Sequence, residues 1–203
     1  MERTLVIATF NAHKLREIRA ILPGLPAELK ALSEFPGAVP AEEDGATLLE
    51  NAVKKAAAAA RFTGCWALAD DTGLEVDALG GAPGVRSARY AGEEADPARN
   101  SSRLLAELAG RPAERRSARF VCVVALASPS GEVATARGVL EGRIAGAPRG
   151  GNGFGYDPLF EPAGSSRTLA ELSEEEKNAA SHRAAALRNL LPELLKRFQR
   201  RSP

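Results

Sequence analysis

Two long strand segments separated by a short turn limit the fold of this 203-residue chain more than any other feature. Residues 117–127 and 133–140 are rich in β-branched and other apolar residues, and Ser128-Pro129-Ser130-Gly131 lies between them. Two strands joined by so short a turn predict an antiparallel hairpin. Because the rest of the chain alternates short strand segments with helical ones, we expect the hairpin to lie inside a larger mixed sheet.

The remaining predicted elements are short strands and amphipathic or alanine-rich helices. Apolar runs predict strands at 4–8 and 66–69, the second of which ends at Asp70-Asp71. Helical spacing or high helix propensity predicts helices over the segments 12–22, 47–63, 96–108 and 184–198. The expected fold is therefore α/β, in a single domain over residues 1–203 with at most two lobes.

Charge and cysteine usage exclude several classes of protein. Lys plus Arg is 27 and Asp plus Glu is 26, a formal net charge of +1, which is not the basic field of a general nucleic-acid binder. Cys65 and Cys122 lie far apart and match no metal or redox spacing. No secretory segment or membrane span is evident. We expect a cytoplasmic protein with neither a nucleic-acid nor a membrane partner.

The first candidate segment joins the first predicted strand to the helix after it and has the sequence Thr9-Phe10-Asn11-Ala12-His13-Lys14. A helix N-terminus offers unpaired backbone N–H groups and a positive dipole end, which favour phosphate. The segment is not a Walker P-loop, since GxxxxGK[ST] is absent. For Asn11 alone, an ordinary helix cap is the commoner role.

Acidic residues form the second candidate group, at Glu42-Glu43-Asp44 and at Asp70-Asp71. Neighbouring strand residues point to opposite faces, so one of the two aspartates is expected to face a ligand and the other a structural partner. Carboxylates without His or Cys nearby suit Mg²⁺, and Glu42 extends the predicted set. Solvated charge for the triplet and a simple turn for the pair remain alternatives.

Two later segments carry aromatic rings and cations. The glycine-rich segment 150–158 bears Phe154 and Tyr156, whose faces suit stacking of a nucleobase, with Asp157 as an acceptor beside them. Packing of this loop onto the core is the alternative. The segment 177–183 contains Lys177, His182 and Arg183, donors that suit an acceptor-rich purine edge.

Lysine is the rare cation of this chain, with 6 Lys against 21 Arg. Lys14, Lys54, Lys55 and Lys177 all lie in or beside the candidate segments. For Lys55, an ordinary solvated helix face explains the position equally well. Taken together, the segments supply a phosphate site, a divalent-metal site, an aromatic surface and a donor cluster, which is the set a nucleotide hydrolase needs.

Several of these segments also match family motifs in order along nearly the whole chain. They are Thr9, Asn11 and Lys14; Glu50-Asn51; Asp70-Asp71-Thr72-Gly73-Leu74; Gly80-Gly81-Ala82-Pro83-Gly84 with Ser87-Ala88-Arg89-Tyr90; Phe154-Gly155-Tyr156-Asp157; and Glu176-Lys177 with Ser181-His182-Arg183. The chain resembles the inosine triphosphate pyrophosphatase family, the XTP/dITP diphosphatases. One departure is Phe10, where many relatives have glycine.

The resemblance implies an elongated mixed sheet flanked by helices, with two lobes and a central nucleotide-binding cleft, in a homodimer. It implies Mg²⁺-dependent hydrolysis of ITP, dITP and XTP to the monophosphate and pyrophosphate. Asp71 would be the proton acceptor, with Glu42 and Asp71 as metal ligands. The implied substrate-binding residues are Thr9, Phe10, Asn11, Ala12, His13, Lys14, Thr72, Phe154, Gly155, Tyr156, Asp157, Lys177, His182 and Arg183.

The chemistry of this reaction fits the residue types. Water attacks the α-phosphorus while pyrophosphate leaves, so charge neutralisation and positioning account for most of the barrier. Donors aimed at O6 of the base would favour inosine and xanthine over adenine, whose amino group would leave those donors unpaired. Two alternatives stay open: a Maf-like pyrophosphatase for dTTP or modified pyrimidines, and a nucleotide sensor without turnover.

Overall fold

A mixed seven-stranded sheet organises the protein, which we describe from a computed structural model over residues 4–94 and 96–199. The strand order is β2-β1-β3-β5-β6-β7, and β4 pairs with β3. The strands are β1 Thr4–Ile7, β2 Glu28–Ala31, β3 Trp66–Val76, β4 Pro83–Gly84, β5 Ser117–Ala127, β6 Val133–Ile144 and β7 Phe160–Pro162. The helices are α1 Ala12–Ile21, α2 Leu48–Thr63, α3 Pro97–Glu107, α4 Glu174–Ala180 and α5 His182–Phe198.

The pairing directions make the sheet a mixed one. β1 is parallel to both β2 and β3, whereas β4 is antiparallel to β3 and β7 is antiparallel to β6. β5 and β6 are neighbours joined by a tight turn, in which Ser128 N–H donates to the Glu132 carbonyl at 2.9 Å. The predicted α/β class with a mixed sheet is confirmed. Both hairpin segments form strands, the first with the predicted bounds and the second continuing past Leu140 to Ile144.

The described residues divide into two compact units. The first contains the chain up to Asp71, residues 122–138 and the chain from Arg183 onward, and the second contains residues 72–121 and 139–182. The predicted single domain over 1–203 includes a few terminal positions that lie outside the described residues.

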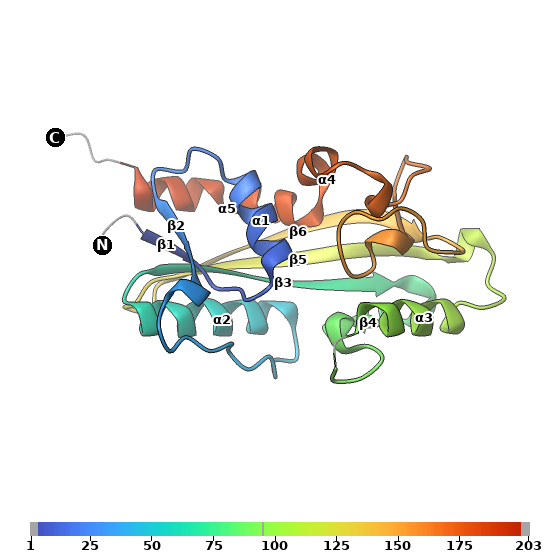
Figure 1. The fold of residues 1–203 in the computed structure, drawn as a ribbon, viewed down its shortest axis with the longest axis horizontal. Helices are drawn as coiled ribbons and strands as arrows, with labels where there is room; N and C mark the ends of the chain where they lie inside the picture. The colour runs from blue at the N-terminus through green and yellow to red at the C-terminus, as the bar shows by residue number, and fades with distance from the viewer. Residues whose placement is uncertain (1–3, 95, 200–203) are drawn as a thin grey trace. The chain divides into compact units, whose positions relative to one another are not determined.

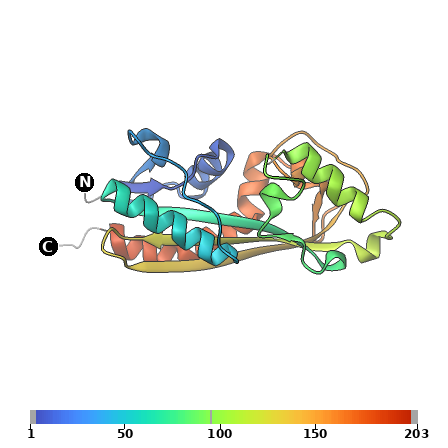
Figure 2. The same ribbon diagram turned by 90° about the horizontal axis from the view of Figure 1, so that it is seen from below.

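In the first unit, helices cover both faces of the strands. Figure 1 shows α2 on one side and α1 with α5 on the other, and Figure 2 shows α2 nearest the viewer. Leu5, Val6 and Ile7 of β1 are all fully buried, as expected for a parallel strand covered on both faces. On the α1 and α5 side, Ile18 and Leu187 belong to the same core cluster as Leu5.

In the second unit, α3 and α4 lie on opposite sides of the strands (Figure 1). Its core cluster includes Leu74, Leu104, Phe120 and Phe160, and the rings of Phe120 and Phe160 lie 4.7 Å apart. None of the helices in the described part of the chain is both long and apolar enough to cross a membrane.

Helix ends follow the signals in the sequence. Asn11 caps α1, and Thr47 caps α2 by accepting the Glu50 N–H at 3.1 Å. Gly64 ends α2 in the left-handed region, at φ 68°. A capping box of Ser173 with Glu176 begins α4.

One boundary differs in a way that matters for the site. The strand predicted over 66–69 does not end at Asp70-Asp71 but continues as β3 to Val76. Leu74 is fully buried and pairs with Gly84 of β4, which extends the strand past the acidic pair. The two aspartates are therefore strand residues, and the simple-turn interpretation of them is wrong.

Candidate active site

Asp70 and Asp71 lie next to each other in β3 and contact helices on opposite sides of the sheet. Asp70 accepts hydrogen bonds from Arg183 of α5 at 2.9 and 3.1 Å, and Asp71 contacts Asn51 and Lys55 of α2. Figure 1 shows α5 and α2 on opposite sides of these strands. The expected division of the pair between two faces is confirmed.

Asp70 is the centre of a buried charge cluster. Its carboxylate is 2% exposed and also meets the Lys14 ammonium at 3.1 Å, while Arg183 makes a further ion pair with Glu17. Burial by itself would raise the pKa of Asp70, but Lys14 and Arg183 overcome that effect and bring the pKa well below its usual range. Asp70 therefore stays ionised and ties α1 and α5 to β3.

Asp71 has a different environment. Its Oδ1 lies 2.8 Å from Lys55 Nζ, and its Oδ2 accepts from Asn51 Nδ2 at 3.3 Å. Burial raises the pKa of Asp71, and the ammonium of Lys55 opposes that shift without cancelling it. A carboxylate with a raised pKa accepts a proton more readily than an ordinary aspartate does.

Glu43, not Glu42, is brought to Asp71. Lys55 Nζ lies 2.8 Å from Glu43 Oε1, so one ammonium joins the two carboxylates, whereas Glu42 is exposed. The loop is folded back because Gly45 N–H donates to Asn51 Oδ1 at 2.8 Å. A Cβ at Gly45 would lie 2.6 Å from that oxygen, so a residue with a side chain would disturb the contact.

The donor set around Asp71 fits a magnesium ion. Among residues 4–94 and 96–199, no group of three or more His, Cys, Asp or Glu side chains is placed to hold a metal. Mg²⁺ in nucleotide enzymes commonly takes one or two protein carboxylates and completes its shell with water and phosphate oxygens. Glu43 and Asp71 match that requirement.

The segment 9–14 consists of the loop 9–11 and the first turn of α1, and its own side chains stabilise it. Asn11 Oδ1 accepts the His13 and Lys14 N–H groups at 2.9 and 3.2 Å, and Thr9 Oγ accepts the Asn11 N–H at 3.1 Å. Asn11 is thus a helix cap in this structure. The segment stays accessible at Phe10, which is 45% exposed, and at Ala12.

The second unit contains the aromatic and donor residues. Asp157 Oδ2 accepts from Lys177 Nζ at 2.6 Å and from the Phe154 N–H at 2.7 Å. Lys177 Nζ also lies 4.7 Å from the centre of the Phe154 ring. Gly153 has a φ of 75°, and a Cβ there would lie 2.1 Å from Asp157 Oδ2. The loop is therefore shaped around the Asp157–Lys177 ion pair.

Other predicted residues of this unit have packing roles. Tyr156 is buried and donates its hydroxyl to the Ser87 carbonyl at 3.0 Å. His182 is buried with its ring stacked on Phe120 at 4.7 Å. Thr72 is half-buried in β3. Packing of the glycine-rich loop onto the core thus accounts for Tyr156, and Phe154 presents the more accessible ring.

Comparison with known proteins decides the family. The family model described as the Ham1 family matches residues 5–193. This chain belongs to the Ham1 family. A relative named dITP/XTP pyrophosphatase from Geobacter sulfurreducens is 56% identical over 183 residues, covering 90% of this chain and 92% of its own. A protein of the same name from Desulforamulus reducens is 51% identical, covering 96% of each chain.

Solved structures of Ham1 proteins share the fold. The HAM1 protein from Coxiella burnetii superposes with a TM-score of 0.86 at 44% identity, covering 96% of this chain and 99% of its own. The Ham1 protein from Staphylococcus aureus gives a TM-score of 0.83 at 40% identity, covering 96% and 98%. The mixed α/β fold of this Ham1 chain is therefore that of its structural relatives.

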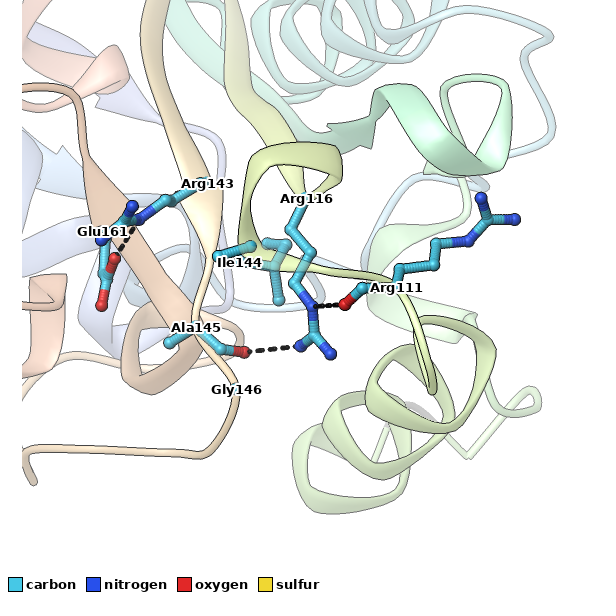
Figure 3. Close-up of a pocket in the computed structure, with 8 residues that line it drawn as sticks. Arg111, Arg116, Arg143, Ile144, Ala145, Gly146 and Glu161 are labelled. Carbon is cyan, nitrogen blue, oxygen red and sulfur yellow. Dashed lines mark hydrogen bonds and ion pairs between the residues drawn. The ribbon is translucent and has the colours of Figure 1, made fainter.

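A separate pocket of about 250 Å³ in the second unit of this Ham1 protein is rich in arginine (Figure 3). Arg116 donates to the carbonyls of Leu108, Arg111 and Ala145, and Arg143 pairs with Glu161. In Figure 3 the guanidinium groups of Arg111, Arg116 and Arg143 point in different directions. The pocket is a junction of structural contacts and not a set of converging donors.

The sequence alone assigned no role to three residues that contact Asp71 or Arg183 in this Ham1 protein. Asn51 and Lys55 stand four apart on α2 and meet the same carboxylate, a spacing that places them on one helix face. Glu17 follows Lys14 by three residues on α1 and meets Arg183. The helical spacing was visible in the sequence, but the partners across the fold were not.

Proposed function

We propose that this chain hydrolyses non-standard purine nucleoside triphosphates (dITP, XTP and ITP) to the monophosphate and pyrophosphate with Mg²⁺. The observation that carries the proposal is the environment of Asp71, a largely buried carboxylate with a raised pKa that shares Lys55 with Glu43. The names of the relatives, dITP/XTP pyrophosphatase, support the same substrate class. If the acidic residues were only solvated surface charge, Asp71 would not be buried and would not share an ammonium with Glu43.

In this proposal the triphosphate and the metal bind around Asp71 and the segment 9–14. Glu43 and Asp71 would hold Mg²⁺, which neutralises phosphate charge and acidifies bound water. Asp71 would accept the proton of the attacking water as the general base. The segment 9–14, including the Lys14 ammonium, binds phosphate oxygens, and Asp70 holds Lys14 near the N-terminus of α1.

Phe154, Lys177 and the residues around them take the base and sugar in the proposal. Phe154 offers its ring for stacking, which is worth about 1–3 kcal/mol per base. Lys177, positioned by Asp157, supplies a donor for a base oxygen. Gly155, Tyr156 and His182 shape this region through the backbone and by packing, and Thr72 contacts the substrate beside Asp71.

Two further parts of the proposal come from the sequence: the cysteine usage and the lack of an evident secretory segment bear on location, and the family resemblance bears on association. We place the enzyme in the cytoplasm and expect two copies to associate. Both parts are open to direct measurement, by fractionation of cells and by light scattering of the purified protein.

A nucleotide panel tests the proposed activity. Purified protein with Mg²⁺ is expected to release pyrophosphate, and not orthophosphate, from dITP, XTP and ITP well ahead of ATP or dTTP. Asp71→Asn should fold normally and turn over about 10²–10⁴-fold more slowly. Asp77→Asn, at an exposed ion pair with Arg119, is the matched control and should keep wild-type turnover. A pyrimidine triphosphate ranking above dITP, or tight binding without turnover, would contradict the proposal.

A further inference from the structure

Lys55 is a nearly buried ammonium that lies between two carboxylates. Its Nζ is 2.8 Å from Asp71 Oδ1 and 2.8 Å from Glu43 Oε1, and its side chain is 11% exposed. The neighbouring Lys54 instead pairs with Asp44, and both of those side chains are exposed. The two adjacent lysines of α2 therefore have different partners, and of the two it is Lys55 that contacts Glu43 and Asp71.

Contacts of Asn51 with Asp71 and with the loop that carries Glu43 fix the surroundings of Lys55. It stands one helical turn after Asn51, which donates to the other oxygen of Asp71 and accepts from Gly45 in the loop that carries Glu43. This arrangement holds Glu43 and Asp71 on either side of the ammonium. Without a cation between them, the two carboxylates would repel each other in a partly dehydrated environment.

Charge counting shows what Lys55 does for the carboxylates. Asp70, which precedes Asp71 in β3, forms its ion pairs with Lys14 and Arg183. Lys55 forms its ion pairs with Glu43 and Asp71 instead. Glu43 and Asp71 with Lys55 carry a net charge of −1, and without Lys55 they would carry −2. The oxygens that Lys55 contacts are the hard ligands that a divalent cation prefers.

We propose that Lys55 is a built-in competitor of the metal ion: it occupies the cation position between Glu43 and Asp71 until a divalent ion replaces it. The inference rests on the metal site of the proposed function and adds a role for a residue outside that site's ligand set. An ammonium is a point charge on a flexible four-carbon stem, so it is able to leave the carboxylates without unfolding α2. The apparent metal affinity is then lowered by the contacts that Lys55 must give up.

Binding of Mn²⁺ to the full-length, metal-free protein tests this role without measuring turnover. Free Mn²⁺ is followed by electron paramagnetic resonance for wild type, Lys55→Met and Lys54→Met. We expect Lys55→Met to bind Mn²⁺ about tenfold more tightly or better, because the competing charge is gone and the carboxylate repulsion is relieved by the metal. Lys54→Met removes the same charge one residue away and should bind within about twofold of wild type, since its ion pair is exposed.

Thermal unfolding gives an independent measurement. Without metal, Lys55→Met should melt below wild type, and saturating Mn²⁺ should raise its melting temperature by more than it raises that of wild type. A lysine with a purely structural role would leave the two metal-induced increases equal. If Lys55→Met does not fold, Lys55→Gln, which keeps a hydrogen-bond donor without the charge, serves in its place.

The possible outcomes distinguish a failure of the Lys55 role from a failure of the proposed metal site. Unchanged or weaker Mn²⁺ binding in the Lys55 variant, with normal binding in wild type, would overturn the competitor role and leave the metal site standing. Absence of Mn²⁺ binding in all three proteins would overturn the metal site and the inference together.

Discussion

Replacement of Asp70 by asparagine is expected to destabilise the fold strongly. Asp70→Asn keeps the shape of the side chain but removes the negative charge that two cations share. Lys14 Nζ at 3.1 Å and Arg183 Nη2 at 2.9 Å would then face a neutral amide, and the Arg183 side chain is only 1% exposed. Arg183 would keep its ion pair with Glu17.

The size of the effect follows from burial. Removing one partner of a buried ion pair costs about 3–5 kcal/mol, because a charge is left without compensation in a poorly solvated place. For a chain of about this size, one kcal/mol corresponds to about 2–4 °C in melting temperature. Asp70→Asn should therefore melt about 6–20 °C below wild type. The matched control Asp77→Asn breaks an exposed pair with Arg119 and should cost less than about 1 kcal/mol.

The pH dependence supplies a second test of the same change. The pKa of Asp70 is lowered in the folded state, so its stabilising contribution is present above the unfolded value of about 3.9 and is lost as the pH falls below that value. The difference in melting temperature between wild type and Asp70→Asn should be constant near neutral pH and shrink as the pH is lowered from about 5 toward 3. Calorimetry across this range measures it. A variant that melts within about 2 °C of wild type at pH 7 would refute the reasoning.

Three other changes test the remaining parts of the site. Lys177→Ala should narrow the preference for ITP over ATP, measured as the ratio of kcat/KM values; an unaltered ratio would place base recognition elsewhere. Gly153→Ala should lower the melting temperature by the equivalent of about 1–3 kcal/mol, because of the left-handed φ of 75° and the clash with Asp157; a stabilised variant would contradict this. Excess chelator should abolish pyrophosphate release from dITP and added Mg²⁺ should restore it, whereas persistent activity would argue against a metal-dependent reaction.

Local signals in the sequence were sufficient for most of the fold. The caps at Asn11 and Thr47 and the terminating Gly64 depend on residues only a few positions apart, so a single sequence contains the information. The extent of β3 depends instead on partners that are distant in the sequence. The strand pairs with β4 beyond the two carboxylates, and Lys14, Lys55 and Arg183, which neutralise those carboxylates, are far apart in the chain.

The site was predictable to the level of segments, and the assignment of individual residues needed the structure. Lys54 and Lys55 are indistinguishable by type, and the difference between them is the face of α2 on which each stands. Ala52, Ala56 and Ala59 mark the buried face and Lys55 borders it, so an alanine stripe of this kind is the signal that could separate them. Glu43 rather than Glu42 contacts Lys55 because of the way the loop folds back at Gly45. The spacing of residues in the sequence does not predict that fold.

The adjacency of Asp70 and Asp71 makes this stretch of the chain intolerant of any change in length. Inserting or deleting one residue earlier in β3 would exchange the faces of the two acids, turning Asp70 toward Asn51 and Asp71 toward Arg183. Two acids separated by a single residue would both point to the same face of the sheet, so the opposite face would have no carboxylate to pair with its cations. Engineering of this enzyme should accordingly place insertions in exposed loops and keep the count of residues between Gly64 and Asp71 unaltered.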